Sequence, residues 1–228
     1  MFKKLSNIGD SGIVCDFGDE VNQEINTEVI ELFHYIKKQS IEGNLEGILN
    51  YTPSYNKLII NFDLKKINSN KIFDFLNSID SSKLDLTQDK KEWTIPICYD
   101  FAMDLENMAK NLKIDKREII NIHSKTDFFI YMIGFVPGHP FMGDLDSKLF
   151  TNRLKTPRVK VPAGSVGVVE KFCNIYPYES PGGWNIIGRT PTKLFNNKDN
   201  VKPCLLSPGD TVKFKSISKK EFENLNNE

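Results

Sequence analysis

The residues best suited to chemistry lie close together near the middle of the second half of the chain. The run 178–184 reads YESPGGW, so a carboxylate, a hydroxyl, two glycines and an indole follow one another. Pro-Gly-Gly predicts a tight turn, and the backbone N–H groups of such a turn form a concave site for an anion. The candidates of this run are Glu179 for proton transfer and, for binding, Ser180, Gly182, Gly183 and Trp184. The alternative is a plain hairpin with the indole in the core.

Arginine is rare in this chain, and three of its four arginines lie in the same region. Arg153, Arg158 and Arg189 fall within residues 128–191, which also hold eight of the 14 glycines and seven of the 11 prolines. A planar guanidinium binds a carboxylate or phosphate through two parallel hydrogen bonds, whereas an ammonium group cannot form this paired arrangement. We therefore select Arg158 and Arg189 as the cationic residues of a catalytic site.

The three histidines do not have the spacing of metal ligands, and the four cysteines form no Cys-x-x-Cys pair. We therefore predict no metal site. His123 ends a predicted helix, where a protonated ring is favoured by the helix dipole, and His139 lies in a rigid Pro-Gly-His-Pro turn. We select His123 as a catalytic candidate and His139 as a substrate-binding candidate. A structural role for either ring is the alternative.

Two glycine-rich runs resemble phosphate or nucleophile motifs without matching them. Residues 138–143, GHPFMG, are followed by Asp-Leu rather than Lys-Ser/Thr, which excludes a Walker-type loop. Residues 163–167, AGSVG, lack the spacing and the strand-to-helix context of a nucleophile elbow. Ser165 therefore stays a candidate for substrate or phosphate binding, and a simple turn between strands is the alternative.

The first elements that must position these residues form an α/β pattern. Apolar spacing predicts strands at 12–17, 46–51, 57–62 and 92–98 and helices at 21–38 and 67–79. The order β-α-β-β-α-β is typical of a ferredoxin-like domain. We place this small N-terminal domain at residues 1–85, with the polar stretch 78–91 as the best linker.

Residues 90–228 form the second predicted domain. Two helices are expected at about 104–124, with Asp115 and Glu118 as an N-terminal cap pair of the second. Short strands then follow, predicted at 128–135, 158–161, 165–169, 173–176, 184–189 and 211–216. Such strands, separated by Gly and Pro, are typical of a compact antiparallel barrel or sandwich. The polar tail 218–228 is expected to be frayed, and the fold class of the chain is α+β.

The net charge of the chain limits the classes of partner that it is expected to bind. Thirty basic and 30 acidic residues give a formal net charge of zero, which argues against nucleic acid or membrane as a partner. Residues 128–195 hold eight basic and four acidic residues, a net charge of +4. No apolar run approaches the roughly 20 residues that span a bilayer, and the N-terminus lacks a secretory signal. We therefore expect a cytoplasmic protein whose cysteines are buried thiols.

Three blocks of sequence together resemble the family of the 5-oxoprolinase B subunit, also known as allophanate hydrolase subunit 1 and as the KipI-type sporulation kinase inhibitor. They read YMIGFVPG from position 131, TPRVKVPAGSVG from 156 and YPYESPGGWNIIGRTP from 176. The segment Tyr99–Glu106 is shorter than the glycine-rich stretch expected there. His139 stands where the family usually has an aromatic residue.

This resemblance implies that the second domain is a cyclophilin-like β-barrel. It also implies that the chain acts in a complex with two further subunits, named A and C, of which C is homologous to it. Such complexes cleave the lactam of 5-oxoproline to glutamate, with ATP and Mg as co-substrate and no metal or organic cofactor bound to this chain. On that basis the chain is expected to be inactive alone. The alternatives are a binding protein that inhibits a sensor histidine kinase and an enzyme component for urea-derived substrates.

Overall fold

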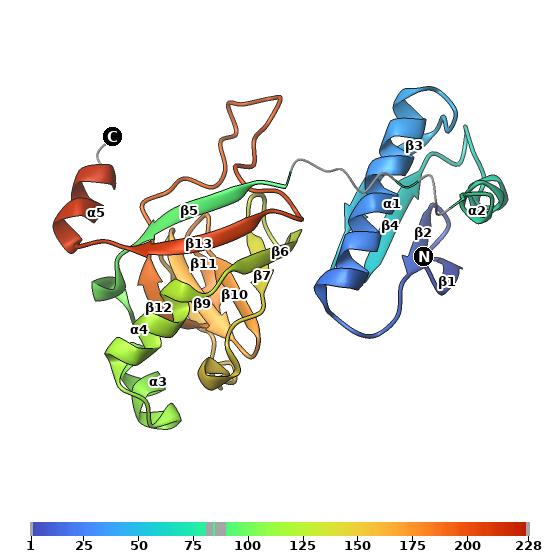
Figure 1. Ribbon diagram of the computed structural model, residues 1–228. Helices are drawn as coiled ribbons and strands as arrows, with labels where there is room; N and C mark the ends of the chain where they lie inside the picture. The colour runs from blue at the N-terminus through green and yellow to red at the C-terminus, as the bar shows by residue number, and fades with distance from the viewer. Residues whose placement is uncertain (1, 81–83, 85–89, 227–228) are drawn as a thin grey trace. The chain divides into compact units, whose positions relative to one another are not determined.

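The computed structural model describes residues 2–80, 84 and 90–226 (Figure 1). The chain divides into two compact units, Met1–Asp89 and Lys90–Glu228. Residues 81–83 and 85–89 of the predicted linker, which include the predicted end of the first domain, lie outside the described residues. Each unit is described by itself.

The first unit is an antiparallel sheet with two helices. Its elements are β1 (Lys4–Asn7), β2 (Gly12–Asp16), α1 (Gln23–Ile41), β3 (Ile48–Pro53), β4 (Lys57–Phe62) and α2 (Ser69–Asn77), and the strand order is β1-β2-β4-β3. Both helices begin at an asparagine, because the side chains of Asn22 and Asn68 accept hydrogen bonds from backbone N–H groups of the first turn.

The core of the first unit follows from strand and helix periodicity. Alternate residues of β4, Leu58, Ile60 and Phe62, are buried against the apolar faces of α1 and α2. The predicted ferredoxin-like order is wrong in two details. Strand β1 precedes the first predicted strand, and the strand expected at 92–98 pairs in the second unit instead.

The second unit is a seven-stranded sheet that nearly closes into a barrel. The strand order is β12-β9-β10-β7-β6-β13-β5, and a separate two-stranded ribbon joins β11 to β8. The bounds are β5 (Glu92–Ile97), β6 (Phe128–Ile133), β7 (Pro140–Gly143), β8 (Arg158–Val161), β9 (Ser165–Val169), β10 (Phe172–Ile175), β11 (Ser180–Gly182), β12 (Asn185–Arg189) and β13 (Thr211–Ser216).

The two edge strands of this sheet meet at one point. Cys98, directly after β5, exchanges two backbone hydrogen bonds of 2.8 and 3.0 Å with Arg189 at the end of β12. Residues 103 and 104 then donate backbone N–H groups to Ile186 O. The segment after β5 therefore closes the gap between the two edge strands. The observed elements confirm the predicted fold class, an α+β chain with a C-terminal barrel.

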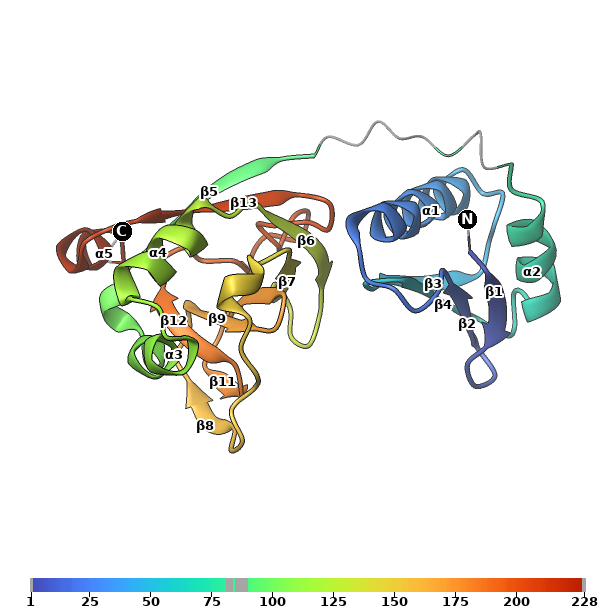
Figure 2. The same ribbon diagram turned by 60° about the horizontal axis from the view of Figure 1, so that its bottom comes forward.

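Helices lie outside the barrel strands, which Figure 2 shows from a second side. Helices α3 (Leu105–Leu112) and α4 (Lys116–Lys125) match the predicted pair, and a short 3-10 turn, η2 (Tyr99–Phe101), precedes them. A second 3-10 turn, η3 (Ser147–Leu149), follows β7. Asp115 caps α4 by accepting the N–H of Arg117 at 2.8 Å. Among the described residues, no helix is both long and apolar enough to cross a membrane.

The prediction of a frayed tail is wrong. Residues Lys219–Asn226 form helix α5, which follows β13 at the end of the chain (Figure 1). Ser218 and Glu221 hydrogen-bond to each other's backbone N–H groups and form a capping box. Phe222 is buried and packs on the ring of Phe101 at 4.7 Å. One buried aromatic and a cap therefore hold a segment that composition alone marks as polar.

Candidate functional site

The strands β7, β10, β9 and β12 have an inner and an outer face. Alternation sends Cys173, Ile175 and their neighbours on the adjoining strands into the barrel core. Asn174 pairs in register with Phe141 on one side and Gly167 on the other, so these residues lie on the outer face. The ribbon β8–β11 packs on this face, where Val161, Tyr176 and Ile186 form a second small core.

A polar cluster lies within this second layer. We call His139, Asn174, Tyr176, Ser180 and Arg158 the outer-layer cluster. The His139 ring is buried, with Nε2 at 3.1 Å from the amide nitrogen of Asn174 and its centroid at 5.1 Å from that of Tyr176. Burial lowers the pKa of His139 to about 4, so the ring is neutral at pH 7. Because the Asn174 amide donates to Nε2, the ring proton lies on Nδ1.

Two glycines, which have no side chain, make room for the polar groups of the cluster. A Cβ at Gly167 would lie 2.7 Å from Oδ1 of Asn174 and 3.0 Å from Cβ of Trp184. A Cβ at Gly182 would lie 2.3 Å from the hydroxyl oxygen of Tyr176. A side chain at either position would therefore displace a polar group of the cluster.

Arg158 is held by a carboxylate that the sequence marks only as a helix start. Asp104 precedes α3, yet its side chain does not cap the helix. Its Oδ1 instead lies 2.6 Å from a guanidinium nitrogen of Arg158, and its Oδ2 accepts the backbone N–H of Ile186 at 2.6 Å. The Asp104 side chain is 3% exposed and that of Arg158 is 24% exposed. This ion pair fixes β8 against β12 and the start of α3.

Four atoms of the outer-layer cluster are buried without a hydrogen-bond partner among the described residues. They are Nδ1 of His139, Oδ1 of Asn174, Oγ of Ser180 and Nη1 of Arg158. A buried polar group without a partner costs about 1–3 kcal/mol, and native proteins retain few such groups. We select these donors and this acceptor, on the ribbon and on the outer face of the sheet, as the candidate site for a polar ligand in this unit.

His123 does not belong to this cluster. Its ring is fully buried on the inner face, 2.8 Å from the Tyr99 hydroxyl through Nδ1 and 3.7 Å from Sγ of Cys173 through Nε2. Burial lowers its pKa to about 3, so the expectation of a protonated ring at the helix end is wrong. Cys173 and Asn174 point to opposite faces of β10, and this strand separates the two histidines.

Arg189 and Ser165 lie at the edge where the barrel closes. They pair in register between β12 and β9. The Nε of Arg189 donates to Ala163 O at 2.7 Å, and its guanidinium lies 5.7 Å from the ring of Phe222. Ser165 is buried, and its carbonyl accepts the N–H of Tyr176. Ser165 therefore adjoins the cluster through its backbone, and Arg189 is connected to the cluster through Ser165.

The remaining predicted residues lie on or beside the ribbon. The predicted Pro-Gly-Gly turn is wrong, because Ser180–Gly182 is strand β11 and neither Gly182 nor Gly183 has a positive φ. Trp184 is buried near Phe141, as the plain-hairpin alternative expects. Glu179 is 56% exposed and pairs with Lys160 at 3.1 Å.

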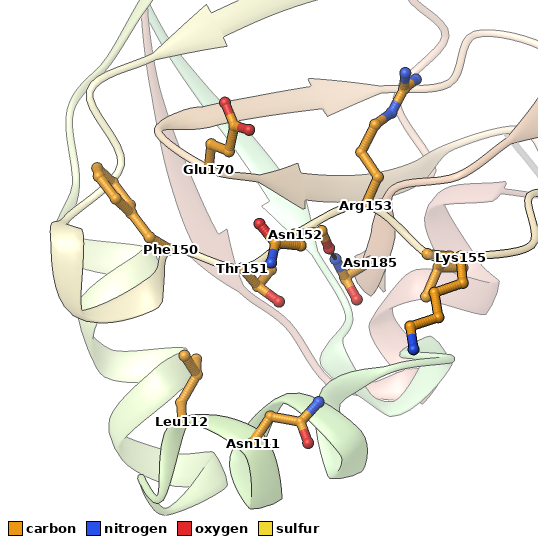
Figure 3. Close-up of a pocket in the computed structure, with 10 residues that line it drawn as sticks. Asn111, Leu112, Phe150, Thr151, Asn152, Arg153, Lys155, Glu170 and Asn185 are labelled. Atoms are coloured by element: carbon orange, nitrogen blue, oxygen red, sulfur yellow. Dashed lines mark hydrogen bonds between the residues drawn. The ribbon is translucent and has the colours of Figure 1, made fainter.

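An open cavity of about 550 Å³ lies next to the start of β12 (Figure 3). Helix α3 and the segment 150–155 form its walls. Its size is within the usual range of small-molecule sites. Sequence reasoning found neither this cavity nor the roles of Asp104 and Asn174. Among the described residues, no group of His, Cys, Asp and Glu is arranged to hold a metal ion.

The sequence and the fold of this chain match those of known proteins. Residues 3–206 match the family described as "Carboxyltransferase domain, subdomain C and D". The crystal structure of TTHA0988 matches with a TM-score of 0.80 and 28% identity over 91% of this chain. This chain spans 40% of the TTHA0988 chain. The class of the protein is therefore that of the carboxyltransferase C and D subdomains.

Two curated relatives define the family more closely. The 5-oxoprolinase B subunit of Bacillus subtilis (strain 168) is 33% identical over 232 residues, covering 96% of this chain and 95% of that protein. The 5-oxoprolinase B subunit of Haemophilus influenzae is 46% identical over 122 residues, 53% of this chain and 57% of that protein. The chain belongs to the family of the 5-oxoprolinase B subunit.

Proposed function

We propose that this chain is the B subunit of an ATP-dependent 5-oxoprolinase and acts together with the A and C subunits, the latter homologous to it. The observation that carries the proposal is the match to the B. subtilis protein along nearly the full length of both chains. The substrate is 5-oxoproline, and the products are glutamate, ADP and phosphate. The complex works in the cytosol, which agrees with the free state of all four cysteines.

The reaction has to overcome the low reactivity of a lactam. The terminal phosphoryl group of ATP is transferred to the lactam oxygen, and ADP leaves. One water molecule then adds to the activated carbon and the carbon–nitrogen bond breaks as the nitrogen takes up a proton, which leaves an acyl phosphate. A second water molecule cleaves this acyl phosphate to the side-chain carboxylate of glutamate and phosphate. Negative charge develops on the transferred group, so cationic and N–H donors are required around it.

The outer-layer cluster and its neighbours supply donors of this kind. Arg158 is oriented by Asp104, and one nitrogen of its guanidinium has no hydrogen-bond partner among the described residues. The neutral ring of His139 presents an N–H at Nδ1, and Ser180 presents a hydroxyl. In the proposal these three groups hold the substrate or the phosphoryl group, and Arg189 supplies a second guanidinium at the edge of the barrel.

Proton transfer is assigned to Glu179. Its carboxylate lies on the exposed side of the ribbon and forms an ion pair with Lys160. Water screens an exposed carboxylate, so the assignment requires that the ribbon is covered by the C subunit in the complex. His123 keeps a packing role, because its ring contacts only core residues.

The test is the release of glutamate and ADP by the three mixed subunits. ATP hydrolysis that depends on 5-oxoproline and on all three proteins is the expected result. A full mixture that forms no glutamate from 5-oxoproline contradicts the proposal. Within an active mixture, Arg189→Ala should lower kcat by roughly 100-fold or more. Arg117→Ala, which removes the one arginine outside residues 128–191, is the matched control and should retain activity.

A further inference from the structure

The open cavity beside β12 has walls that are already fixed in place. Glu170 donates its backbone N–H to Thr151 O at 2.8 Å, and Leu154 donates to Gly183 O at 2.8 Å. The side chain of Asn185 donates to Asn152 O at 2.9 Å. Three hydrogen bonds thus tie the segment 150–155 to the β9–β10 hairpin and to the start of β12. A site held in this way needs little reorganisation when a ligand binds.

The lining changes in character from one side of the cavity to the other. Figure 3 shows Phe150 and Leu112 on one side and Lys155 on the other, with Thr151 and Asn185 between them. Phe150 is 43% exposed, which leaves a ring face available to a flat group. The order across the cavity is therefore aromatic and aliphatic, then amide and hydroxyl, then cationic.

The cationic side is available to an anion. Arg153 and Lys155 form no ion pair within the described part of the chain, and both side chains are exposed. Lys155 extends toward Asn111, whereas Arg153 extends in the opposite direction (Figure 3). Glu170 is the single carboxylate of the lining. Lys155 is therefore the residue best placed to meet a phosphate across the cavity, and Arg153 needs only a rotation of an exposed side chain.

We propose that this cavity binds the adenine nucleotide of the reaction, so that ATP is held by this chain. The base lies on Phe150, the amides of Asn152 and Asn185 line the middle of the nucleotide, and Lys155 with Arg153 receives the phosphates. A small anion would use only the cationic side, whereas a nucleotide also uses the aromatic side and suits a space of about 550 Å³. The use of ATP rests on the proposed function, and the location of the site rests on the cavity.

The experiment is a calorimetric titration of the full chain with ATP, ADP, inorganic triphosphate and phosphate. The variants are Lys155→Glu and Phe150→Ala, and Lys198→Glu is the control because Lys198 is an exposed lysine outside the cavity. Loss of a charge-assisted hydrogen bond is worth about 10- to 100-fold in affinity. We expect ATP to bind one site per chain, Lys155→Glu to weaken it at least tenfold, and Lys198→Glu to leave it unchanged. Phe150→Ala should weaken ATP but not triphosphate.

Three other outcomes decide whether the cavity is a nucleotide site. Triphosphate binding as tightly as ATP, with no effect of Phe150→Ala, overturns the nucleotide site in favour of a simple anion site. If the chain alone binds no ATP, the KM for ATP of the three-protein mixture is measured. A KM raised at least tenfold by Lys155→Glu supports the inference, and an unchanged KM overturns it.

The two proposals fail separately. If the mixture cleaves 5-oxoproline and Lys155→Glu does not change its KM for ATP, the proposed function is supported and the nucleotide site is contradicted. If the chain binds ATP and the variants behave as expected, but the mixture does not cleave 5-oxoproline, the nucleotide site is supported and the proposed function is contradicted.

Discussion

The sheet formed by β7, β9, β10 and β12 buries one histidine on its inner face and one on its outer face. The two histidines differ in how many of their ring nitrogens have a hydrogen-bond partner. On the inner side, both ring nitrogens of His123 have a neighbour, the Tyr99 hydroxyl and the Cys173 thiol. On the outer side, Nε2 of His139 contacts Asn174, while Nδ1 has no partner among the described residues. Burial lowers the pKa of both rings. Burial alone therefore does not distinguish the two rings, whereas the hydrogen-bond partners of their nitrogens do.

The largest expected effect concerns the ion pair that holds the outer layer. Arg158→Ala leaves the Asp104 carboxylate buried without its cation, and breaking a buried pair in this way costs about 3 kcal/mol of the free energy of unfolding. Urea denaturation measures the loss. Arg117→Ala, an exposed arginine, should change the free energy of unfolding by less than about 0.5 kcal/mol.

A double variant tests the physical reason. Asp104→Asn with Arg158→Met removes both charges and keeps an acceptor for the N–H of Ile186. It should recover part of the loss caused by Arg158→Ala alone. If Arg158→Ala costs no more than Arg117→Ala, the ion pair does not hold the ribbon to the barrel.

The second effect is a pH dependence that the two histidines share. The pKa of His123 is lowered to about 3 and that of His139 to about 4, against about 6.5 in an unfolded chain. As the pH falls below 6.5 the unfolded state takes up a proton that the folded state does not. Each histidine then lowers the free energy of unfolding by about 1.4 kcal/mol per pH unit until its folded pKa is reached.

Replacing either ring by Phe should therefore flatten the fall in stability between pH 6.5 and 4, by about 2 kcal/mol at pH 5. At pH 7 the two variants should differ. His123→Phe leaves the Tyr99 hydroxyl without its ring partner and costs about 1–3 kcal/mol. His139→Phe also removes an unpartnered N–H, so its cost should be smaller. Equal losses at pH 7 would contradict the contrast between the two faces.

The smallest effect concerns the space beside Tyr176. Gly182→Ala places a methyl group at 2.3 Å from the tyrosine oxygen and should cost about 1–2 kcal/mol by overpacking. Tyr176→Phe removes that oxygen, so adding it to Gly182→Ala should restore part of the thermal stability. Additive losses in the double variant would mean that the two side chains do not compete for space.

Much of the first unit can be predicted because local periodicity decides it. Strand β4 has the predicted bounds, and the apolar spacing of α1 identifies the helix. The strand at 92–97 is identified by its sequence but predicted in the wrong sheet. Its partner is β13, more than a hundred residues later, and no local signal reports that pairing. The α5 helix does carry a signal, the Ser218 and Glu221 cap.

The site can be predicted in part. Composition locates the arginines and the segment 176–184, since Arg is rare in this chain and Gly and Pro are concentrated in residues 128–191. The short strands β7 and β11 escape prediction, because they are rich in Pro and Gly and owe their form to strands far away in the sequence. Asp104 and Asn174 look like an ordinary helix start and an ordinary strand residue. Only the folded chain brings them to Arg158 and His139.

The strand order of the barrel also sets when this unit can fold during synthesis. β13 ends at residue 216 but lies between β6 and β5, so the two strands made first must wait for the strand made last. All strands and helices of the first unit lie within residues 4–77, and that unit can form while the rest is still being made. Until residues 211–216 have been made, the edges of β5 and β6 that β13 later covers stay unpaired. A ribosome stalled between residues 191 and 211 would therefore carry a folded first unit followed by a sheet that lacks β13 and cannot pair with β5.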